Sequence, residues 1–426
     1  MGLNLEQSRT QPRKQPGTQA RNAFRRAARR WRPAAAAIGL VILGGCAATG
    51  ENAGTTSRDV DSPNPDVGVV GAWIVTLDRG SDGLPESTLT MLRLPIPDVA
   101  SGTDAHVEVK QATIPCEGIG NGGMLRLSHD GAWALVPIGA NSGVLQLVYL
   151  AGPQPAVIDT IDFNSPVGRV SWRRDNTLIA VALPEKEEIA IIPVTGTGFG
   201  EPTQWPMPGV KPTAVEWSPS GRRLAVIAEG VIPVGFFSVR GEGGQSMGLR
   251  RISVDFSAMP IEGVAIKSGH WTSNERALIV FGSSFGANTG DNPAAVSIVS
   301  FDEQEGGRWL GGFNIAGAAT ASAMSPEGDL LAVVTVDFNL GVGGAISLFR
   351  VDPSTGALEV ADQVAVDGPP SSISFDRAGT TLLATDFERD LIRIWRIDRS
   401  ERDPRLIDTG LEVETGIAPH AVAVAP

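Results

Sequence analysis

The stretch Trp217-Ser-Pro-Ser-Gly-Arg-Arg-Leu-Ala-Val226 decides the fold of this chain of 426 residues. A bulky apolar residue comes first, a polar turn follows, and an apolar run of β-forming residues closes the unit. This order predicts two antiparallel strands joined by a tight turn, the second of them buried on both faces. Five further segments share the pattern: Leu127–Val136, Trp172–Val181, Trp271–Val280, Met324–Val333 and Phe375–Ala384.

The spacing of these units points to one repeat architecture. Their first residues, the anchors, lie 45, 45, 54, 53 and 51 residues apart. A period of this size with several short strands per unit is typical of propeller blades. The 51 glycines and 30 prolines, about a fifth of the chain, suit the turns of such a fold and disfavour long helices.

The two ends of the repeat region supply a seventh blade. Pro419–Val424 matches the strand that precedes each anchor, as in Pro212–Trp217. The strands that this blade then lacks are expected at Val69–Leu77, Leu89–Leu94 and Val107–Ala112. We therefore expect an all-β, seven-bladed propeller over residues 69–426 in which N- and C-terminal strands close one blade and leave no exposed sheet edge.

Several short motifs connect this pattern to a known family. Ser218–Gly221, Ser325–Gly328, Val351–Gly356 and Pro419–Val424 resemble the seven-bladed lactonase-like propellers, which include relatives of 6-phosphogluconolactonase and YVTN-repeat surface proteins. In hydrolytic members of that family, a Gly-Pro-Arg-His segment with nearby Arg and Glu residues lies over the central funnel. Here the comparable segment reads Gly368-Pro369-Pro370-Ser371, without Arg or His.

The charge of the chain is unevenly distributed. The formal net charge is −12, but residues 1–45 hold nine basic residues and one acid, a net of +8. The remainder, with 26 basic and 46 acidic residues, carries −20, which argues against nucleic acid as a partner. A basic segment followed by the short apolar run Ala34–Leu43 is the pattern of an export signal.

The end of this run predicts a lipid anchor. Leu43-Gly44-Gly45-Cys46 resembles the lipobox of bacterial lipoproteins, a family in which the Cys is acylated and becomes the new N-terminus. Ala47 is not the Asp associated with inner-membrane retention, so we expect an outer-membrane lipoprotein facing the periplasm or the cell surface, or a cell-membrane lipoprotein where there is no outer membrane. We therefore predict a signal peptide over residues 1–45, then lipidated Cys46 and a flexible tether to residue 68, with an r.m.s. span of ~25 Å.

Motifs and residue counts exclude several kinds of site. Gly118-x-Gly120-x-x-Gly123 precedes an expected strand instead of a helix, so a dinucleotide site is not expected. Two cysteines and four histidines leave little room for a metal centre, and no metal or cofactor is predicted. Calcium stays as a low-ranking alternative because no loop offers a full oxygen ligand set. His270, on an innermost strand, is expected to be a hydrogen-bonded structural histidine.

Candidate site residues come from the loops at one end of the ring. His420 begins an innermost strand and is the histidine that we would test as an acid or base, together with Asp337, Asp386 and Glu229. Other charged residues near the same mouth form a candidate ligand rim, which a polar, solvated rim would equally explain. These rim residues are Asp78, Arg79, Glu185, Lys211 and Arg389.

Two functions follow from these features. The first is a monomeric, lipid-anchored binding or scaffold protein of the cell envelope, with a protein or peptide partner on the rim. The alternative is a lactonase-like hydrolase that acts on a lactone or cyclic ester at the central funnel. Glycan binding without chemistry is a third hypothesis, against which the 6% of aromatic residues argue. A His/Arg/Glu cluster at the axis would favour the enzyme.

Overall fold

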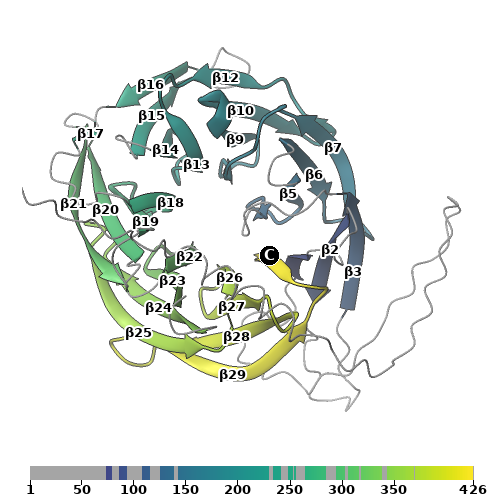
Figure 1. The fold of residues 1–426 in the computed structure, drawn as a ribbon, viewed down its shortest axis with the longest axis vertical. Helices are drawn as coiled ribbons and strands as arrows, with labels where there is room; N and C mark the ends of the chain where they lie inside the picture. Colours follow the sequence, from purple (N-terminus) through teal and green to yellow (C-terminus); the bar gives the residue numbers. More distant parts are fainter. Residues whose placement is uncertain are drawn as a thin grey trace, which may run out of the picture. The chain divides into compact units, whose positions relative to one another are not determined.

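Residues from Trp73 onward form a ring of β-sheets in a computed structural model (Figure 1). The structure describes residues 73–78, 86–93, 108–115, 125–138, 143–229, 234–240, 248–252, 254–255, 264–284, 294–302, 306–315, 318–337, 343–368 and 370–425. The predicted signal peptide, Cys46 and the tether lie outside these residues.

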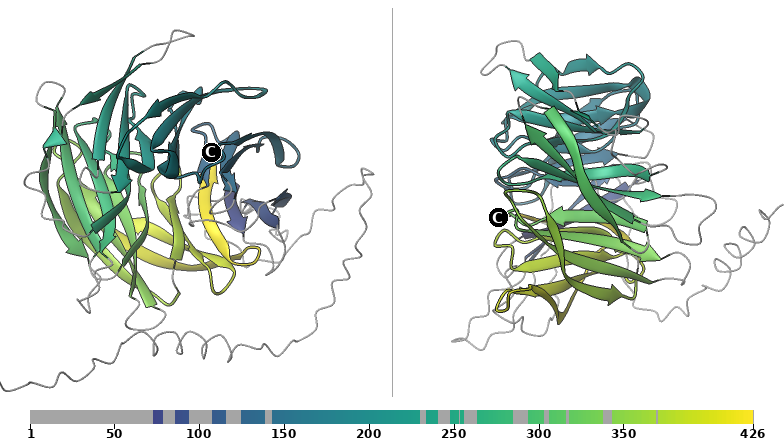
Figure 2. Two further views of the ribbon diagram at one scale, coloured as in Figure 1. Left: turned by 45° about the horizontal axis from the view of Figure 1, so that its top comes forward. Right: turned by 90° about the vertical axis from the view of Figure 1, so that its left-hand side faces the viewer.

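Seven antiparallel sheets surround a common axis, as the fold prediction requires (Figures 1 and 2). Each blade has four main strands, and in six of the blades the chain runs from the innermost strand to the outermost. Blade 1 comprises β4 (Arg126–Leu127), β5 (Trp133–Ile138), β6 (Val144–Tyr149) and β7 (Ala156–Asp162). Blade 2 comprises β8 (Val170–Trp172), β9 (Leu178–Leu183), β10 (Glu188–Thr195), β11 (Gly198–Phe199) and β12 (Thr203–Pro206).

The next two blades repeat this order. Blade 3 comprises β13 (Lys211–Trp217), β14 (Arg223–Glu229), β15 (Val234–Arg240) and β16 (Gly248–Ile252). Blade 4 comprises β18 (Val264–Trp271), β19 (Ala277–Ser284), β20 (Ala294–Asp302) and β21 (Gly306–Ile315), with β17 (Val254–Asp255) parallel to β21.

Blades 5 and 6 have long outer strands. Blade 5 comprises β22 (Ala318–Met324), β23 (Leu330–Asp337), β24 (Gly343–Val351) and β25 (Leu358–Val366). Blade 6 comprises β26 (Pro370–Phe375), β27 (Thr381–Asp386), β28 (Leu391–Asp398) and β29 (Arg405–Glu414). The outer strand β25 is mostly exposed or half-buried, as expected for a strand that needs only one buried face.

The seventh blade is built from both ends of the described chain. Its sheet order is β3 (Glu108–Pro115), β2 (Glu86–Arg93), β1 (Trp73–Asp78) and β30 (Pro419–Ala425). The innermost strand β30 runs antiparallel to β1, with Ala425 opposite Trp73. The predicted closure of the ring is confirmed.

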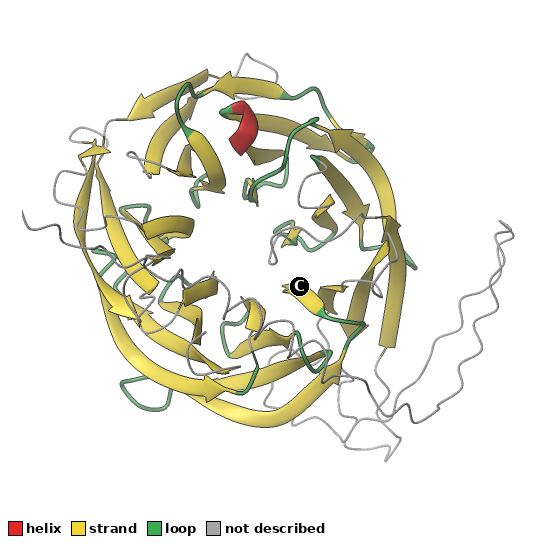
Figure 3. Cartoon of the chain, viewed as in Figure 1, coloured by secondary structure: helices red, strands yellow, loops and turns green. Residues whose placement is uncertain are grey.

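The second strand of each blade forms the core. All six residues of β9 and of β27 are buried, as expected for apolar runs covered on both faces. Clusters of buried side chains span neighbouring blades; one of them brings Leu135 and Leu147 of blade 1 against Trp172 and Ile179 of blade 2. Helical structure among the described residues is limited to one short turn, η1 (Pro184–Lys186; Figure 3).

The turn after each anchor has one repeated backbone geometry. The fourth residue after the anchor has a left-handed backbone conformation. It is Gly221 in blade 3, with φ +69°, and a glycine occupies the same position in three other turns. Glu275 holds it with φ +62°, a conformation that is unfavourable for a side chain with a Cβ. The Glu275 carboxylate accepts a hydrogen bond from Ser220 N and forms an ion pair with Arg223 at 3.0 Å, which offsets that cost.

Candidate functional site

The ring has two ends with different chemistry. We call the end where the innermost strands begin the loop face, and the end with the anchor turns the turn face. Four of the five candidate acids from the sequence are the last residues of second strands and so lie at the loop face, whereas Glu185 lies in η1, just after β9. The four are Asp78 of β1, Glu229 of β14, Asp337 of β23 and Asp386 of β27.

Bulges shape the loop face in a repeated way. In blade 3, the pairing of β13 with β14 passes from Pro212 to Ala214 and leaves Thr213 without an opposite residue. One extra residue also interrupts the innermost strand near its start in blades 4, 5 and 7, and blade 6 has a wider break between Pro370 and Ile373. A bulge re-aims the side chain of the extra residue, and in blade 7 that residue is His420.

His420 lies between blades 6 and 7. Its side chain is partly exposed, and its ring is tilted against Phe387 with a centroid distance of 5.0 Å. The neighbouring Ser371 hydroxyl donates to Pro419 O at 2.9 Å and contacts the Thr385 hydroxyl at 2.8 Å. The structure therefore places His420 near the start of β30, at the loop face and against Phe387.

Asp386 is held in place by other parts of blade 6. Its side chain is 4% exposed, forms an ion pair with Arg393 at 3.4 Å and accepts a hydrogen bond from Arg389 N at 3.2 Å. A Cβ on Gly368 would lie only 2.7 Å from Asp386 Oδ1, so the loop before β26 packs directly on this carboxylate. These contacts give Asp386 a structural role.

Asp78 has the corresponding position in blade 7. Its carboxylate is 1% exposed and accepts hydrogen bonds from Thr90 Oγ1 at 3.0 Å and Gly416 N at 3.2 Å. Its Oδ1 atom has no partner among the described residues. Burial raises the pKa of Asp78 to about 6, and the charge of Asp390 raises it further, against the hydrogen bonds that lower it. Asp78 thus joins β1 to the loop that enters β30.

The other rim candidates are solvent-exposed. Lys211 pairs with Glu185 at 3.4 Å, and Arg389 lies 3.8 Å from Asp367. Glu229 is exposed on blade 3, opposite Lys211 in the sheet register. Exposed pairs of this kind contribute little to stability. Arg79 and the side chain of Asp337 lie outside the described residues.

A second charged group, which sequence reasoning missed, lies on the innermost strands. We call Arg126, Arg169, Glu216 and His270 the axial cluster. Arg126, Glu216 and His270 each directly precede an anchor, and Arg169 directly precedes β8. All four side chains are partly exposed. An alignment of the six anchors would have pointed to this cluster, because three of the six residues that directly precede an anchor are ionisable.

The four side chains act on one another electrostatically. Burial raises the pKa of Glu216 to about 7, although the charges of Arg126 and Arg169 and a hydrogen bond from Ser171 lower it. Burial also lowers the pKa of Arg169 to about 10, and the like charge of Arg126 adds to this effect. Burial, followed by the two arginine charges, lowers the pKa of His270 to about 3, so its imidazole is neutral at physiological pH.

Contacts between blades fix the backbone of this cluster. Trp172 Nε1 donates to Arg126 O at 3.2 Å, and Trp271 Nε1 donates to Glu216 O at 3.1 Å. Arg169 N donates to Thr213 O at 2.9 Å. The cluster is thus carried on rigid strands, which favours a preorganised site.

His270 is oriented by a neighbouring blade. Its Nε2 atom lies 2.7 Å from the hydroxyl of Ser322 on β22, and its ring is parallel to that of Phe281 within 10°. The expectation of a hydrogen-bonded histidine on an innermost strand agrees with this geometry. That expectation did not include the arginines and Glu216 nearby.

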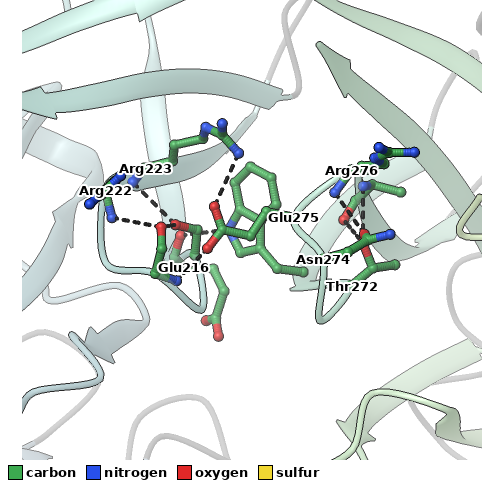
Figure 4. A network of polar contacts seen from close by, with 11 residues as sticks. Glu216, Arg222, Arg223, Thr272, Asn274, Glu275 and Arg276 are labelled. Carbon is green, nitrogen blue, oxygen red and sulfur yellow. Dashed lines mark hydrogen bonds and ion pairs between the residues drawn. The ribbon is translucent and has the colours of Figure 1, made fainter. Parts of the chain in front are cut away.

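Polar contacts on the turn face hold the segments that follow Glu216 and His270 (Figure 4). Arg223 reaches from blade 3 to Glu275 of blade 4, and these side chains are 19% and 11% exposed. Asn274 Oδ1 accepts hydrogen bonds from Thr272 Oγ1 and Arg276 N, both at 3.0 Å. This network stabilises the ends of the two innermost strands.

Two other kinds of site have no candidate in the described part of the chain. No group of three or more His, Cys, Asp or Glu residues there could hold a metal ion. None of its helices is long and apolar enough to cross a membrane.

Comparison with solved structures identifies several matches of fold. The periplasmic gluconolactonase of Pseudomonas aeruginosa matches with a TM-score of 0.60 and 16% identity, over 83% of this chain and 99% of that one. A protein from Bacteroides fragilis that has been proposed to be a 6-phosphogluconolactonase matches with a TM-score of 0.61 and 12% identity, over 83% and 98%. A Lactobacillus plantarum protein gives 0.60 and 16%, over 83% and 99%.

These matches establish the seven-bladed fold and nothing finer, because sequence identity is low. No family model matches the sequence, and no curated protein is significantly similar to it.

Proposed function

We propose that this protein hydrolyses a lactone or related cyclic ester at the axial cluster, with Glu216 as the general base. The observation that carries the proposal is that one carboxyl group and two guanidinium groups come from the innermost parts of three neighbouring blades, which Trp172 Nε1 and Arg169 N join by hydrogen bonds to Arg126 O and Thr213 O. Burial raises the pKa of this carboxyl group, that of Glu216, to about 7. A base with this pKa accepts protons efficiently near neutral pH. The likeness to lactonases supports the proposal at the level of the fold.

The reaction would proceed by attack of water on the ring carbonyl. The Glu216 carboxylate takes a proton as the water oxygen bonds to the carbonyl carbon. Arg126 or Arg169 stabilises the negative charge on the carbonyl oxygen. The ring C–O bond then breaks, and the protonated Glu216 returns its proton to the leaving oxygen, which yields a hydroxy acid. His270 is neutral and serves as a hydrogen-bonding group instead of a proton carrier.

This mechanism moves the chemistry away from the loop face. The structure gives Asp386 an arginine partner and leaves Glu229 exposed in a different blade. His420 stays a candidate because its side chain is partly exposed at the mouth. Variants at Glu216 and His420 therefore decide between the two faces.

The test is a panel of lactones whose hydrolysis is followed by acid release. Glu216→Gln should lower kcat by roughly 10²–10⁴-fold, the usual contribution of a general base. The wild-type rate should rise with pH through about 7, because Glu216 acts in its deprotonated form. Glu201→Gln, a change of an exposed acid outside every candidate site to its amide, is the matched control and should leave the rate unchanged. Full activity of Glu216→Gln together with loss in His420→Ala would return catalysis to the loop face.

The second candidate function is a binding or scaffold role with a protein or peptide partner on the rim. It is favoured by Gly368-Pro369-Pro370-Ser371, which lacks the Arg and His of the comparable segment in hydrolytic propellers. No turnover across the lactone panel, with a stoichiometric partner recovered from membranes, would support this role over hydrolysis.

We also infer that the protein is exported and attached to the membrane through Cys46, as an outer-membrane lipoprotein in cells that have an outer membrane. The sequence Leu43-Gly44-Gly45-Cys46 after a basic, apolar leader supports this inference. Cys46→Ser should abolish labelling by a clickable palmitate analogue and release the protein from the membrane fraction. Cys116→Ser is the matched control, and unchanged fractionation of Cys46→Ser would contradict the anchor.

A further inference from the structure

We propose that the loop Thr415–Ala418, which leads into the last strand β30, is a pH-sensitive latch on the ring. It holds blade 7 closed while Asp78 is protonated, and it opens more often once Asp78 is ionised. We call this loop the latch. The inference concerns the closure of the fold, so it goes beyond the proposed function and does not depend on whether the protein is a hydrolase or a binding protein.

The first support is the place of the latch in the fold. β30 is the innermost strand of blade 7, and it pairs with β1 from the other end of the described chain. The latch connects β30 to β29, the outermost strand of blade 6. Blade 7 is therefore complete only while the latch keeps β30 in register with β1.

The second support is that two aspartates hold the backbone of the latch. Gly416 N donates to Asp78 Oδ2 at 3.2 Å, and Ala418 N donates to Asp390 Oδ1 at 2.6 Å. The amide and the hydroxyl of Thr415 both donate to Asp390 O, at 2.9 and 3.0 Å. Asp78 ends β1 of blade 7, whereas Asp390 lies in the turn between β27 and β28 of blade 6. The latch thus depends on one carboxyl group from each of the two blades that it joins.

The third support is strain in the backbone of the latch. Ala418 has a φ of +53°, a left-handed conformation that is unfavourable for a residue with a Cβ. The hydrogen bond from Ala418 N to Asp390 Oδ1 offsets this cost. A strained loop returns to an ordinary conformation when the bonds that hold it are lost, so loss of the Asp78 contact favours opening.

The fourth support is the uneven distribution of hydrogen bonds on Asp78. Thr76 Oγ1, Thr90 Oγ1 and Gly416 N all donate to Oδ2, at 3.4, 3.0 and 3.2 Å. The Oδ1 atom is buried and has no partner among the described residues. A buried carboxylate is costly when one of its oxygens has neither water nor a donor, whereas an uncharged carboxyl group costs less. Opening of the latch returns the carboxylate to water, so ionisation favours the open form.

The charged groups around Asp78 do not offset this cost. Asp390 faces it from the turn between β27 and β28, Glu414 ends β29, and His420 lies on β30 with its ring against Phe387. Among the described residues, Asp390 is the charged group that acts on Asp78, and its like charge disfavours ionisation. Burial, the larger cause, and the charge of Asp390 raise the pKa of Asp78 to about 6, against the hydrogen bonds that lower it. The latch therefore responds between about pH 5 and pH 7.

The test is hydrogen–deuterium exchange of the full chain, followed by mass spectrometry between pH 5 and pH 7.5 and corrected for the intrinsic exchange rate of each peptide. The protection of the β1 and β30 amides should fall about tenfold over this range, because the pKa of Asp78 is about 6 in the closed ring and returns to its ordinary value when the latch opens. The amides of β9 and β14, in blades 2 and 3, should keep their protection.

Four variants separate charge from strain. Asp78→Asn should make the protection of β1 and β30 independent of pH. Thr90→Val removes a donor that lowers the pKa of Asp78, so the fall in protection should move to higher pH. Ala418→Gly relieves the left-handed φ and should raise protection severalfold at every pH without removing the pH dependence. Exposed Glu201→Gln is the matched control and should behave as the wild type.

Each outcome decides for or against the latch. A pH-dependent fall that is confined to β1 and β30 and absent from Asp78→Asn supports it, and where that variant fails to fold, the shift in Thr90→Val serves instead. A parallel fall in β9 and β14 would show that Asp78 acts on the ring as a whole and would overturn the latch. The wild-type pH dependence in Asp78→Asn would overturn it as well. Because none of these measurements uses lactone turnover, the latch and the proposed function can fail separately.

Discussion

At the scale of single residues, two aspartates in equivalent positions have different electrostatic surroundings. Asp386 ends β27 under Gly368 and pairs with Arg393. Asp78 ends β1 under Gly416, receives only neutral hydrogen-bond donors and is close to the like charge of Asp390. Burial raises the pKa of Asp78 to about 6, with a smaller rise from the charge of Asp390, so this carboxylate opposes folding at neutral pH.

The pH dependence of stability should reveal this residue. A folded-state pKa above the unfolded value means that the native state binds the proton more tightly, so stability is lost as the pH rises from about 4 to 6. The loss from Asp78 amounts to about 3 kcal/mol. Asp78→Asn should remove it and be more stable than the wild type at pH 7.5 but not at pH 4, as measured by urea unfolding. Exposed Glu201→Gln should show no such pH-dependent gain, and an equal gain at both pH values would refute the account.

The burial and charge state of individual residues were the hardest features to predict from the sequence. The ends of second strands could be found from apolar runs, which placed Asp78 and Asp386 at the loop face. Their burial could not be found, because it depends on the loops at Gly416 and Gly368 that return from far along the chain. The pKa of Glu216 depends in the same way on arginines from blades 1 and 2.

At the scale of elements, the repeated unit is an innermost strand, bulged in five of the seven blades, followed by a buried second strand. The apolar runs and turns were readable because alternation and turn chemistry are local. The bulges could not be predicted, because they arise where the innermost strands of blades 3 to 7 meet their partners at the loop face. The bulged residues, such as His420, lie at the loop face. Beyond each bulge the pairing is regular, and Glu216 and His270 lie at the other end of their strands, next to the turn face.

The loop that enters β30 should tolerate no added carbon. A Cβ at Gly416 would lie 2.7 Å from Asp78 Oδ2 and 3.0 Å from both Cβ and Cγ of that residue. Gly416→Ala should therefore destabilise the ring by about 1–3 kcal/mol, the usual cost of overpacking. Gly196→Ala is the matched control, because a Cβ at that position would have nothing within 4 Å. Equal melting temperatures for the two variants would show that the loop can move away from Asp78.

At the scale of the whole molecule, the negative charge of the domain and the positive charge of the axial cluster together affect how fast an anion can bind. The segment after residue 45 carries −20, whereas the axial cluster holds two guanidiniums and a half-protonated acid. Long-range repulsion slows the approach of an anion, and dissolved salt screens that repulsion more than it screens a partly buried contact. The ring itself was predictable at this scale, since the 45–54-residue period and the matching ends specify seven blades.

The pairing of β30 with β1 also determines the order in which the blades can fold during synthesis. Trp73 and Ala425 are neighbours in one sheet, although roughly 350 positions separate them along the polypeptide. Six blades can form in turn as the chain emerges from the ribosome, but the seventh waits for the final strand. Until then β1 presents an unpaired edge to the cell. A chaperone that acts on this protein during synthesis or transport would therefore be needed most at β1. It would be needed there until β30 is synthesised and pairs with β1.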